Sequence, residues 1–159
     1  MSQQQRILFV CLGNICRSPT AEGVMRGILE QQALTDTVHL ESAGTAGYHE
    51  GAPPDPRAME AAQRRGYRLE GQRARQVTTR DFREFDLILC MDRSNLASLE
   101  TMRPADARAR LALFLEYTGN QGVPEVPDPY YGGDKGFERV LDLLEEACQQ
   151  LARELAAAR

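Results

Sequence analysis

The chain has 159 residues, 42% hydrophobic and 26% charged, which predicts one globular domain over residues 1–159. Its net charge of -4 argues against non-specific nucleic-acid binding, because such binding requires a basic surface. No apolar run approaches the length of a membrane span, and the polar residues 1–6 do not resemble a signal peptide.

Hydrophobic periodicity predicts strands and helices in turn along the first half of the chain. Residues 7–10 are all apolar, as in a buried strand, whereas Ala21, Met25, Ile28 and Leu29 recur at helical spacing. The predicted elements are a strand at 6–11, a helix at 18–32, a strand at 38–43, a Gly- and Pro-rich loop at 44–56 and a short helix at 56–66 that Gly66 closes.

The second half continues the alternation and ends in a long amphipathic helix. The predicted elements are a short helical turn capped by Thr78 or Thr79, a strand at 87–90, a helix at 92–102, a strand at 111–115, a loop at 116–133 and a C-terminal helix with Asp134 as its N-cap. The apolar face of that last helix consists of Phe137, Val140, Leu141, Leu144, Cys148, Leu151 and Leu155. A long loop such as 116–133 inside a compact domain is usually functional.

Strands that alternate with helices and are apolar throughout indicate a parallel sheet that is covered on both faces. Right-handed crossover connections then restrict the possible strand orders. We therefore predict a three-layer α/β fold, in which a four-stranded parallel sheet carries helices on both faces in a flavodoxin-like winding.

The junction between the first strand and the first helix carries the strongest functional signal. Cys11 ends the strand, Arg17 follows after five intervening residues, and Ser18 begins the helix. In α/β proteins such a turn binds ligands, and its backbone N–H groups and helix N-terminus attract an anion. A cysteine in that field is expected to be a thiolate, which beside a bound phosphate is a nucleophile for phosphoryl transfer.

The spacing Cys-x5-Arg is weak evidence by itself, because four cysteines and many arginines produce chance matches. The alternative interpretation is a small buried cysteine and a surface arginine. The context favours the functional interpretation, since the cysteine follows an apolar run and Gly13 and Asn14 tolerate unusual backbone angles.

A candidate proton donor lies in the long predicted loop. Asp128 is followed by Pro129, which stiffens the backbone, and by Tyr130 and Tyr131. An acid beside aromatic rings suits an enzyme for aryl phosphates, whose leaving oxygen must be protonated. Taken alone, the segment is better interpreted as an ordinary Asx-Pro turn with tyrosines on the surface.

Together these two segments closely resemble the low-molecular-weight protein tyrosine phosphatases. The resemblance covers essentially the whole chain. The segments that carry it are 11–18, 42–45, 55–57, 74–75, 91–96 and 128–131.

The resemblance implies a role for individual residues. Cys11 would form a phosphocysteine, Arg17 would bind two phosphate oxygens, and Asp128 would act first as general acid and then as general base. Neither a metal nor a cofactor would be needed, because the loop amides and Arg17 neutralise the transferring group. The residues implied to bind phosphate or the substrate ring are Leu12, Gly13, Asn14, Ile15, Cys16, Ser18, Tyr48, Tyr130 and Tyr131.

Two further residues are implied to support the loop. Ser42 would bond to Asn14, which would hold a left-handed conformation, and Ser18 would donate to the Cys11 sulfur. Gln72 stands where many family members have a histidine, and it can both donate and accept hydrogen bonds. Tyr48 stands where several relatives have a tryptophan, a difference that bears on substrate preference.

The remaining cysteines divide into two kinds. Cys90 ends a buried strand and Cys148 lies on an apolar helix face, so both are predicted to be core residues. Cys16 either fills space beneath the loop or, as the resemblance suggests, forms a redox-sensitive disulfide with Cys11 under peroxide. Four cysteines in these positions, with no Cys-x2-Cys pair and two histidines, indicate a reduced cytoplasmic protein without a zinc site.

The leading prediction is a protein tyrosine phosphatase that acts on phosphotyrosine proteins and binds phosphate or another oxyanion in the loop. One alternative is an arsenate reductase of the same fold, which requires additional cysteines on a mobile segment. Another is a protein-arginine phosphatase, whose loop carries threonine where Ile15 stands. The third is a non-catalytic phosphate-binding module, which would need neither a nucleophile nor an acid.

Overall fold

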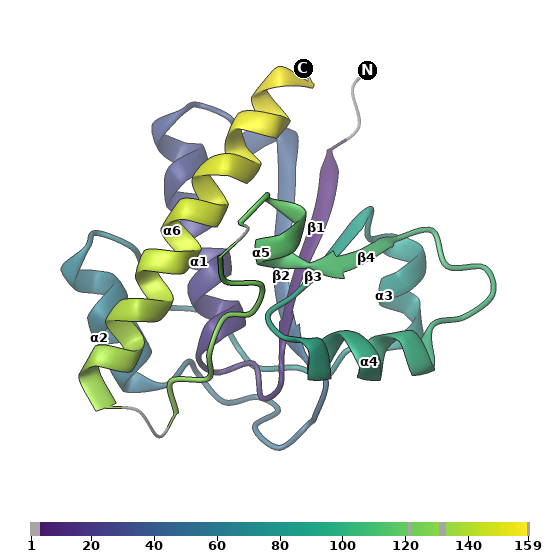
Figure 1. Ribbon diagram of the computed structural model, residues 1–159, viewed down its shortest axis with the longest axis horizontal. Coiled ribbons are helices and arrows are strands. Elements are labelled where there is room, and N and C mark those ends of the chain that lie inside the picture. Colours follow the sequence, from purple (N-terminus) through teal and green to yellow (C-terminus); the bar gives the residue numbers. More distant parts are fainter. Residues whose placement is uncertain (1–3, 121, 131–132, 159) are drawn as a thin grey trace.

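The computed structural model describes residues 4–120, 122–130 and 133–158. A four-stranded parallel sheet lies at its centre, with strand order β2-β1-β3-β4 (Figure 1). The strands are β1 (Gln5–Cys11), β2 (Val38–Gly44), β3 (Leu87–Cys90) and β4 (Arg110–Leu113). The predicted α/β class, the parallel sheet and the flavodoxin-like winding are confirmed.

Helices cover both faces of this sheet. The helices are α1 (Arg17–Gln31), α2 (Pro56–Arg64), α3 (Thr79–Glu84), α4 (Arg93–Met102), α5 (Phe114–Tyr117) and α6 (Gly133–Ala157), with a 3-10 turn η1 (Thr35–Thr37) before β2. Because alternate residues of a strand face opposite sides, Ile7 and Phe9 pack in the core beneath α1 and α6. Leu8 and Val10 pack in a second core, to which α3 and α4 contribute.

The strand order places the site. β1 is flanked by β2 on one side and by β3 on the other, so the chain reverses its winding direction at β1. In sheets of this kind ligands bind in the crevice at the carboxyl ends of the strands, beside the point of reversal. Cys11 is the last residue of β1 and therefore lies at that crevice.

One predicted strand is partly wrong. The apolar run at 111–115 was expected to be a strand throughout, but β4 ends at Leu113 and the next four residues form the short helix α5. Phe114 and Leu115 are both buried, so the run is apolar in either conformation. A short apolar run cannot by itself distinguish a strand from a buried helical turn.

The starts of two helices also differ from the prediction. Helix α1 begins at Arg17, one residue before Ser18, and its N-cap Cys16 makes no side-chain cap bond. Ser18 does not cap the helix, because its hydroxyl bonds to Cys11 and Asn14 in the loop. Helix α6 begins at Gly133, so Asp134 lies inside the first turn, where its charge still favours the helix N-terminus. By contrast, Thr78 caps α3 and Gly66 follows α2 with φ 88°, both as predicted.

No helix within the described part of the chain is both long and apolar enough to cross a membrane.

Candidate active site

Cys11 lies at the floor of the predicted loop, where its side chain is almost fully buried. Its Sγ accepts a hydrogen bond from the Asn14 backbone N–H at 3.3 Å. The Ser18 Oγ lies 3.0 Å from the same sulfur. The sulfur also faces the N-terminus of α1, which favours negative charge. The polar groups that contact the sulfur are therefore ones that stabilise a thiolate.

Asn14 shapes the loop around that sulfur. Its φ of 58° is the left-handed conformation that asparagine tolerates better than most residues. Its side-chain Nδ2 donates to the Ser18 Oγ at 2.8 Å and to the Ser42 Oγ at 3.0 Å. Ser42 in turn donates to the Gln72 Oε1 at 3.4 Å, while Gln72 Nε2 donates to the Pro19 carbonyl at 3.0 Å. Gln72 is therefore connected to the loop on two sides.

Gly44, at the end of β2, allows the loop to lie close to the sheet. A Cβ atom at this position would lie 2.7 Å from the Leu12 carbonyl oxygen and 3.2 Å from the Asn14 Cβ. The backbone N–H groups of Thr45 and Ala46 donate to the carbonyls of Cys11 and Leu12, which ties the loop to this strand end. A side chain at Gly44 would push the loop away from these bonds.

Arg17 is buried beside Cys11, with only 3% of its surface exposed. Its Nη1 donates to the Asp92 Oδ2 at 2.6 Å and to the Val126 carbonyl at 3.0 Å. Its Nη2 lies 3.7 Å from the Asp128 Oδ2. Burial opposes the charge, but the Cys11 sulfur and the Asp92 carboxylate outweigh burial and raise the pKa of Arg17. The guanidinium is therefore a fixed cation.

Asp92 was not predicted as part of the site. It is the N-cap of α4, accepting from the Asn95 N–H with one oxygen while the other binds Arg17. Its place directly after an apolar strand was an available signal, because polar residues that follow parallel strands meet at one edge of the sheet.

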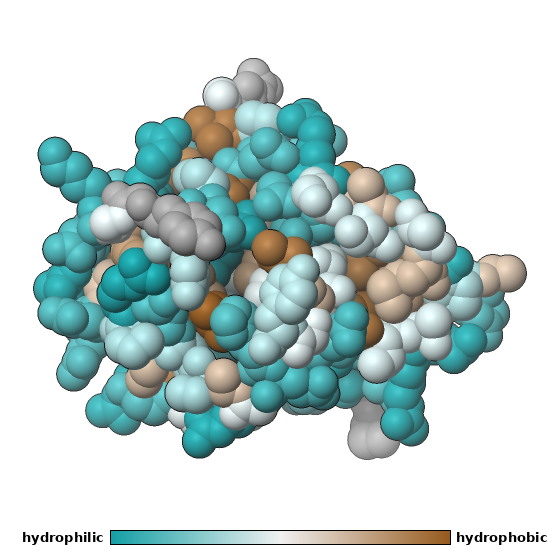
Figure 2. Space-filling model, turned by 90° about the horizontal axis from the view of Figure 1, so that it is seen from below, coloured by the Kyte–Doolittle hydropathy of each residue, from teal (hydrophilic) through white to brown (hydrophobic). Residues whose placement is uncertain are grey.

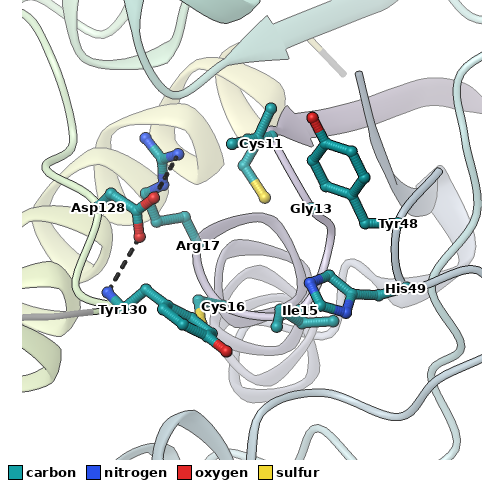
Figure 3. Close-up of a pocket in the computed structure, with 10 residues that line it drawn as sticks. Cys11, Gly13, Ile15, Cys16, Arg17, Tyr48, His49, Asp128 and Tyr130 are labelled. Carbon is teal, nitrogen blue, oxygen red and sulfur yellow. Dashed lines mark hydrogen bonds and ion pairs between the residues drawn. The ribbon is translucent and has the colours of Figure 1, made fainter. Parts of the chain in front are cut away.

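Asp128 lies beside Arg17 at the edge of the cavity, on the side away from Tyr48 (Figure 3). Its Oδ1 accepts from the Tyr130 backbone N–H at 3.0 Å, and 47% of its side chain is exposed. Cys11, Arg17 and Asp128 therefore line a single cavity although they come from distant parts of the sequence.

That cavity has a volume of about 360 Å³. Its lining residues are Cys11, Leu12, Gly13, Ile15, Cys16, Arg17, Tyr48, His49, Asp128 and Tyr130. Figure 2 views this end of the molecule and shows hydrophobic atoms beside a hollow in that face. Within the described ranges, the large hydrophobic side chains that remain exposed are Leu12, Tyr48 and Tyr130, and all three line the cavity. Tyr131 lies outside the described residues.

His49 is a second residue of the site that the sequence analysis did not predict, and unlike Asp92 it lines the cavity. Its imidazole lies edge-on to the Tyr48 ring, with ring centres 6.4 Å apart. It also covers Gly13, where an added Cβ would lie 3.0 Å from the His49 Cδ2. The adjacent Tyr48 was the available signal, because neighbouring loop residues often share one rim.

The other three cysteines are not positioned as Cys11 is. Cys16 is buried beside the loop, and burial, reinforced by Asp55, raises its pKa to about 12, so that it remains a thiol at neutral pH. Cys90 and Cys148 have no exposed surface, and burial raises the pKa of both. Their predicted place in the core is confirmed.

Within residues 4–120, 122–130 and 133–158, no group of three or more His, Cys, Asp or Glu side chains is placed to hold a metal ion. The cavity instead brings together a sulfur, a fixed guanidinium, a helix N-terminus and a carboxyl group. This set defines the class of cysteine-based phosphoryl-transfer sites on a three-layer α/β fold.

Comparison with known proteins identifies the family. Residues 6–159 match the model described as low molecular weight phosphotyrosine protein phosphatase, so the chain belongs to that family. A Synechocystis relative is 49% identical over 151 residues, which cover 94% of this chain and 96% of the relative. The crystal structure of a protein tyrosine phosphatase from Entamoeba histolytica is 41% identical with a TM-score of 0.91, covering 98% of this chain and 99% of the other.

The same fold also serves another reported substrate class. The crystal structure of a drosophila arginine phosphatase matches with a TM-score of 0.87 and 30% identity, covering 93% of this chain and 96% of the other. The fold alone therefore does not distinguish a phosphotyrosine phosphatase from a phosphoarginine phosphatase.

Proposed function

We propose that this protein hydrolyses phosphotyrosine in proteins, and small aryl phosphates, through a phosphocysteine at Cys11. The observation that carries the proposal is the arrangement across one cavity of the buried Cys11 sulfur, the Arg17 guanidinium and the Asp128 carboxyl group. In the first step the Cys11 thiolate attacks phosphorus, the P–O ester bond breaks, and Asp128 donates its proton to the leaving oxygen.

In the second step Asp128, now a carboxylate, takes a proton from water. The water oxygen attacks phosphorus, the P–S bond breaks, and Cys11 leaves as a thiolate, which restores the starting state. The Ser18 hydroxyl, 3.0 Å from the sulfur, stabilises the thiolate both as nucleophile and as leaving group.

Arg17 and the loop amides supply the charge stabilisation that this reaction requires. The Nη1 atom is held by Asp92 and Val126, so Nη2 remains on the cavity side of the guanidinium, toward Asp128. A phosphate group in the loop would contact this edge and the backbone N–H groups of residues 12–18, which the start of α1 turns toward the same space. We therefore expect turnover without added metal or cofactor.

The walls of the cavity favour an aromatic substrate group. Tyr48 and Tyr130 lie on opposite sides of the opening in Figure 3, and each has an exposed ring. An aryl phosphate entering between them would stack on both rings while its phosphate reached Cys11. Ile15 lines the same cavity and offers only apolar contact, which supports the aromatic ring of phosphotyrosine over the polar guanidino group of phosphoarginine.

Cysteine substitution tests the activity directly. Cys11→Ser should abolish hydrolysis of an aryl phosphate while phosphate or vanadate still binds, because the loop and Arg17 remain. Cys16→Ser is the matched control, since it removes a neighbouring sulfur and should keep the activity. Full turnover by Cys11→Ser would refute the proposal. The same variant, used as a trap in lysate, would capture phosphotyrosine proteins as substrates.

Substrate comparison tests the two enzymatic alternatives. Arsenate reduction requires additional cysteines on a mobile segment, whereas Cys16 is buried in the loop itself and Cys90 and Cys148 have no exposed surface. We therefore expect no thiol-dependent arsenate turnover. We expect faster hydrolysis of a phosphotyrosine peptide than of a phosphoarginine peptide with the same flanking sequence. Faster hydrolysis of the phosphoarginine peptide would show that the protein is an arginine phosphatase.

The proposal extends to redox protection and to the compartment. Cys16 is a free cysteine in the same loop as Cys11, so it is placed to condense with a Cys11 sulfenic acid that peroxide forms; the products are a disulfide and water. The four free cysteines support work in a reducing compartment such as the cytoplasm. Mass mapping after mild peroxide should find the 11–16 disulfide, and a Cys11 sulfinate without it would exclude the protective role.

A further inference from the structure

The segment at residues 74–77 lies outside the cavity but is bonded to the edge of the phosphate loop. The Arg75 carbonyl accepts from the Gly44 N–H at 2.8 Å, and the Val77 N–H donates to the Gly44 carbonyl at 2.9 Å. These bonds form an isolated parallel bridge between Gly44 and Gln76. The segment therefore extends the sheet by a short stretch beside the end of β2.

The backbone N–H of Arg75 contacts the loop in a way that fixes the orientation of the Asn14 side-chain amide. It donates to the Asn14 Oδ1 at 3.0 Å. A backbone N–H can only donate, so it requires the oxygen of the Asn14 amide on its side. The amide NH2 must then face Ser18 and Ser42, to which it donates at 2.8 and 3.0 Å.

This orientation determines where the Ser18 proton goes. The Ser18 Oγ accepts from Asn14, so its own single proton is left to donate. Its two possible acceptors are the Cys11 Sγ at 3.0 Å and the Ala43 carbonyl at 3.4 Å. The sulfur is nearer and, as a thiolate, is the stronger acceptor. The hydrogen bonds thus run in one direction, from Arg75 through Asn14 and Ser18 to Cys11.

Besides the bonds to Gly44, the Arg75 side chain holds this backbone in place. Its Nη1 and Nη2 each lie 3.0 Å from an oxygen of Asp81, and Nη2 lies 3.2 Å from the Glu41 Oε1. Asp81 is buried and also accepts from the Thr78 N–H at 2.8 Å in the capping box of α3. A bidentate pair with a buried, fixed carboxylate positions an arginine with little freedom. Glu41, from the edge strand β2, also contacts His39 at 2.6 Å.

We propose that Arg75 is a positioning residue for catalysis, whose pairing with Asp81 fixes the backbone N–H that orients the Asn14 amide and, through Ser18, directs a proton toward the Cys11 sulfur. This inference rests on the proposed function, because it concerns the same thiolate. It adds a residue that touches neither the phosphate nor the cavity.

The test compares Arg75→Gln with Arg73→Gln. Arg73 is an exposed arginine two residues earlier, whose side chain donates to the Gln72 carbonyl. We expect Arg75→Gln to lower kcat for an aryl phosphate about tenfold, with phosphate inhibition unchanged, because the sulfur is affected and the anion site is not. Arg73→Gln should keep both values. A merely structural role would instead reduce the active fraction and leave kcat per titrated Cys11 unchanged.

A double-mutant cycle with Asn14→Gly decides whether the effect passes through Asn14. If it does, Arg75→Gln should lower kcat less than about twofold further in the Asn14→Gly background. Independent, multiplicative losses would overturn the proposal, as would an unchanged kcat in Arg75→Gln. Arg75→Lys keeps a cation beside Asp81 but not the fork, so it should recover thermal stability and not kcat.

Arg75→Lys also carries the test if Arg75→Gln does not fold, and wild-type kcat in Arg75→Lys would then overturn the proposal. The proposed function fails separately, since its failure appears as turnover by Cys11→Ser, whatever the behaviour of the Arg75 variants.

Discussion

The loop at residues 11–18 and the segment around Asp128 face each other across one cavity, but they are held in different ways. Cys11, Asn14, Arg17 and Ser18 are all buried, and hydrogen bonds connect them to β2, to α4 and to the segment at 74–77. The Asp128 side chain is about half exposed, and it contacts the Tyr130 N–H and the edge of Arg17.

This difference in burial predicts different effects of substitution on stability and on catalysis in the two regions. Removing a buried, hydrogen-bonded group leaves its partners unpaired and lowers the free energy of unfolding. Removing an exposed carboxyl group leaves little unpaired. Substitutions in the loop should therefore change activity and stability together, whereas substitutions at Asp128 should change activity alone.

After Cys11→Ser, the largest expected effect on activity is that of Asp128→Asn. Asparagine keeps the shape but cannot donate a proton to the leaving oxygen, so kcat should fall about 10² to 10⁴, most for substrates with poor leaving groups. The free energy of unfolding should change by less than about 0.5 kcal/mol. A series of substituted aryl phosphates and a urea titration measure both. A loss of stability as large as that of a loop variant would contradict the contrast between the two regions.

Arg17→Ala should reduce both quantities. Loss of the charge that stabilises the transferring phosphoryl group should lower kcat/KM about 10² to 10³. The variant also leaves Asp92 without its buried partner, which should cost about 3 kcal/mol of the free energy of unfolding. Arg93→Ala is the control. Arg93 follows Asp92 in the sequence, and the bond that it makes near the site comes from its backbone N–H, which donates to Glu125 and remains in the alanine variant. Wild-type stability in Arg17→Ala would show that the Arg17–Asp92 pair does not contribute to the free energy of unfolding.

Two substitutions of Asn14 separate its backbone conformation from its hydrogen bonds. Both Asn14→Gly and Asn14→Ala lose the amide that contacts Ser18, Ser42 and Arg75, so kcat should fall about tenfold in each. Only alanine is strained at a φ of 58°, so it should be the less stable of the two by about 1 kcal/mol. Thermal melts alongside kinetics make the comparison. Equal melting temperatures would mean that the loop relaxes out of the left-handed conformation.

Much of the nucleophile half could be predicted from sequence because its determinants are local. An apolar run, a cysteine, a tolerant Asn and an arginine follow one another within one strand–turn–helix unit, and the winding of the sheet fixes where that unit lies. The partners of Arg17 could not be predicted in the same way. Asp92 and Val126 are distant in sequence and reach it only through the packing of β3 and the long loop.

The same distinction explains the errors in the fold. The strands at 87–90 and 38–43 were predicted to within a residue, since Asp86 precedes the first and Gly44 ends the second. At 111–115 the apolar run continues past the end of β4, and only the packing of Phe114 beside Phe9 distinguishes helix α5 from a longer strand. The contact of Arg75 with Asn14 could not be predicted either, because a backbone N–H makes it and no side-chain pattern reveals that bond.

The last expected effect is confined to stability at alkaline pH, and it compares Cys16 with the other buried cysteines. An unfolded cysteine loses its proton near pH 8.5, whereas burial raises the pKa of Cys16 to about 12. Between these values the unfolded state binds fewer protons than the folded state, so the free energy of unfolding falls as pH rises. Cys16→Ala should lessen this slope between pH 9 and about pH 11 by up to about 1.4 kcal/mol per pH unit, while Cys90 and Cys148 keep part of it. Urea titrations at half-unit intervals would measure the slope, and parallel curves for the two proteins would show that Cys16 is more hydrated than its place beneath the loop indicates.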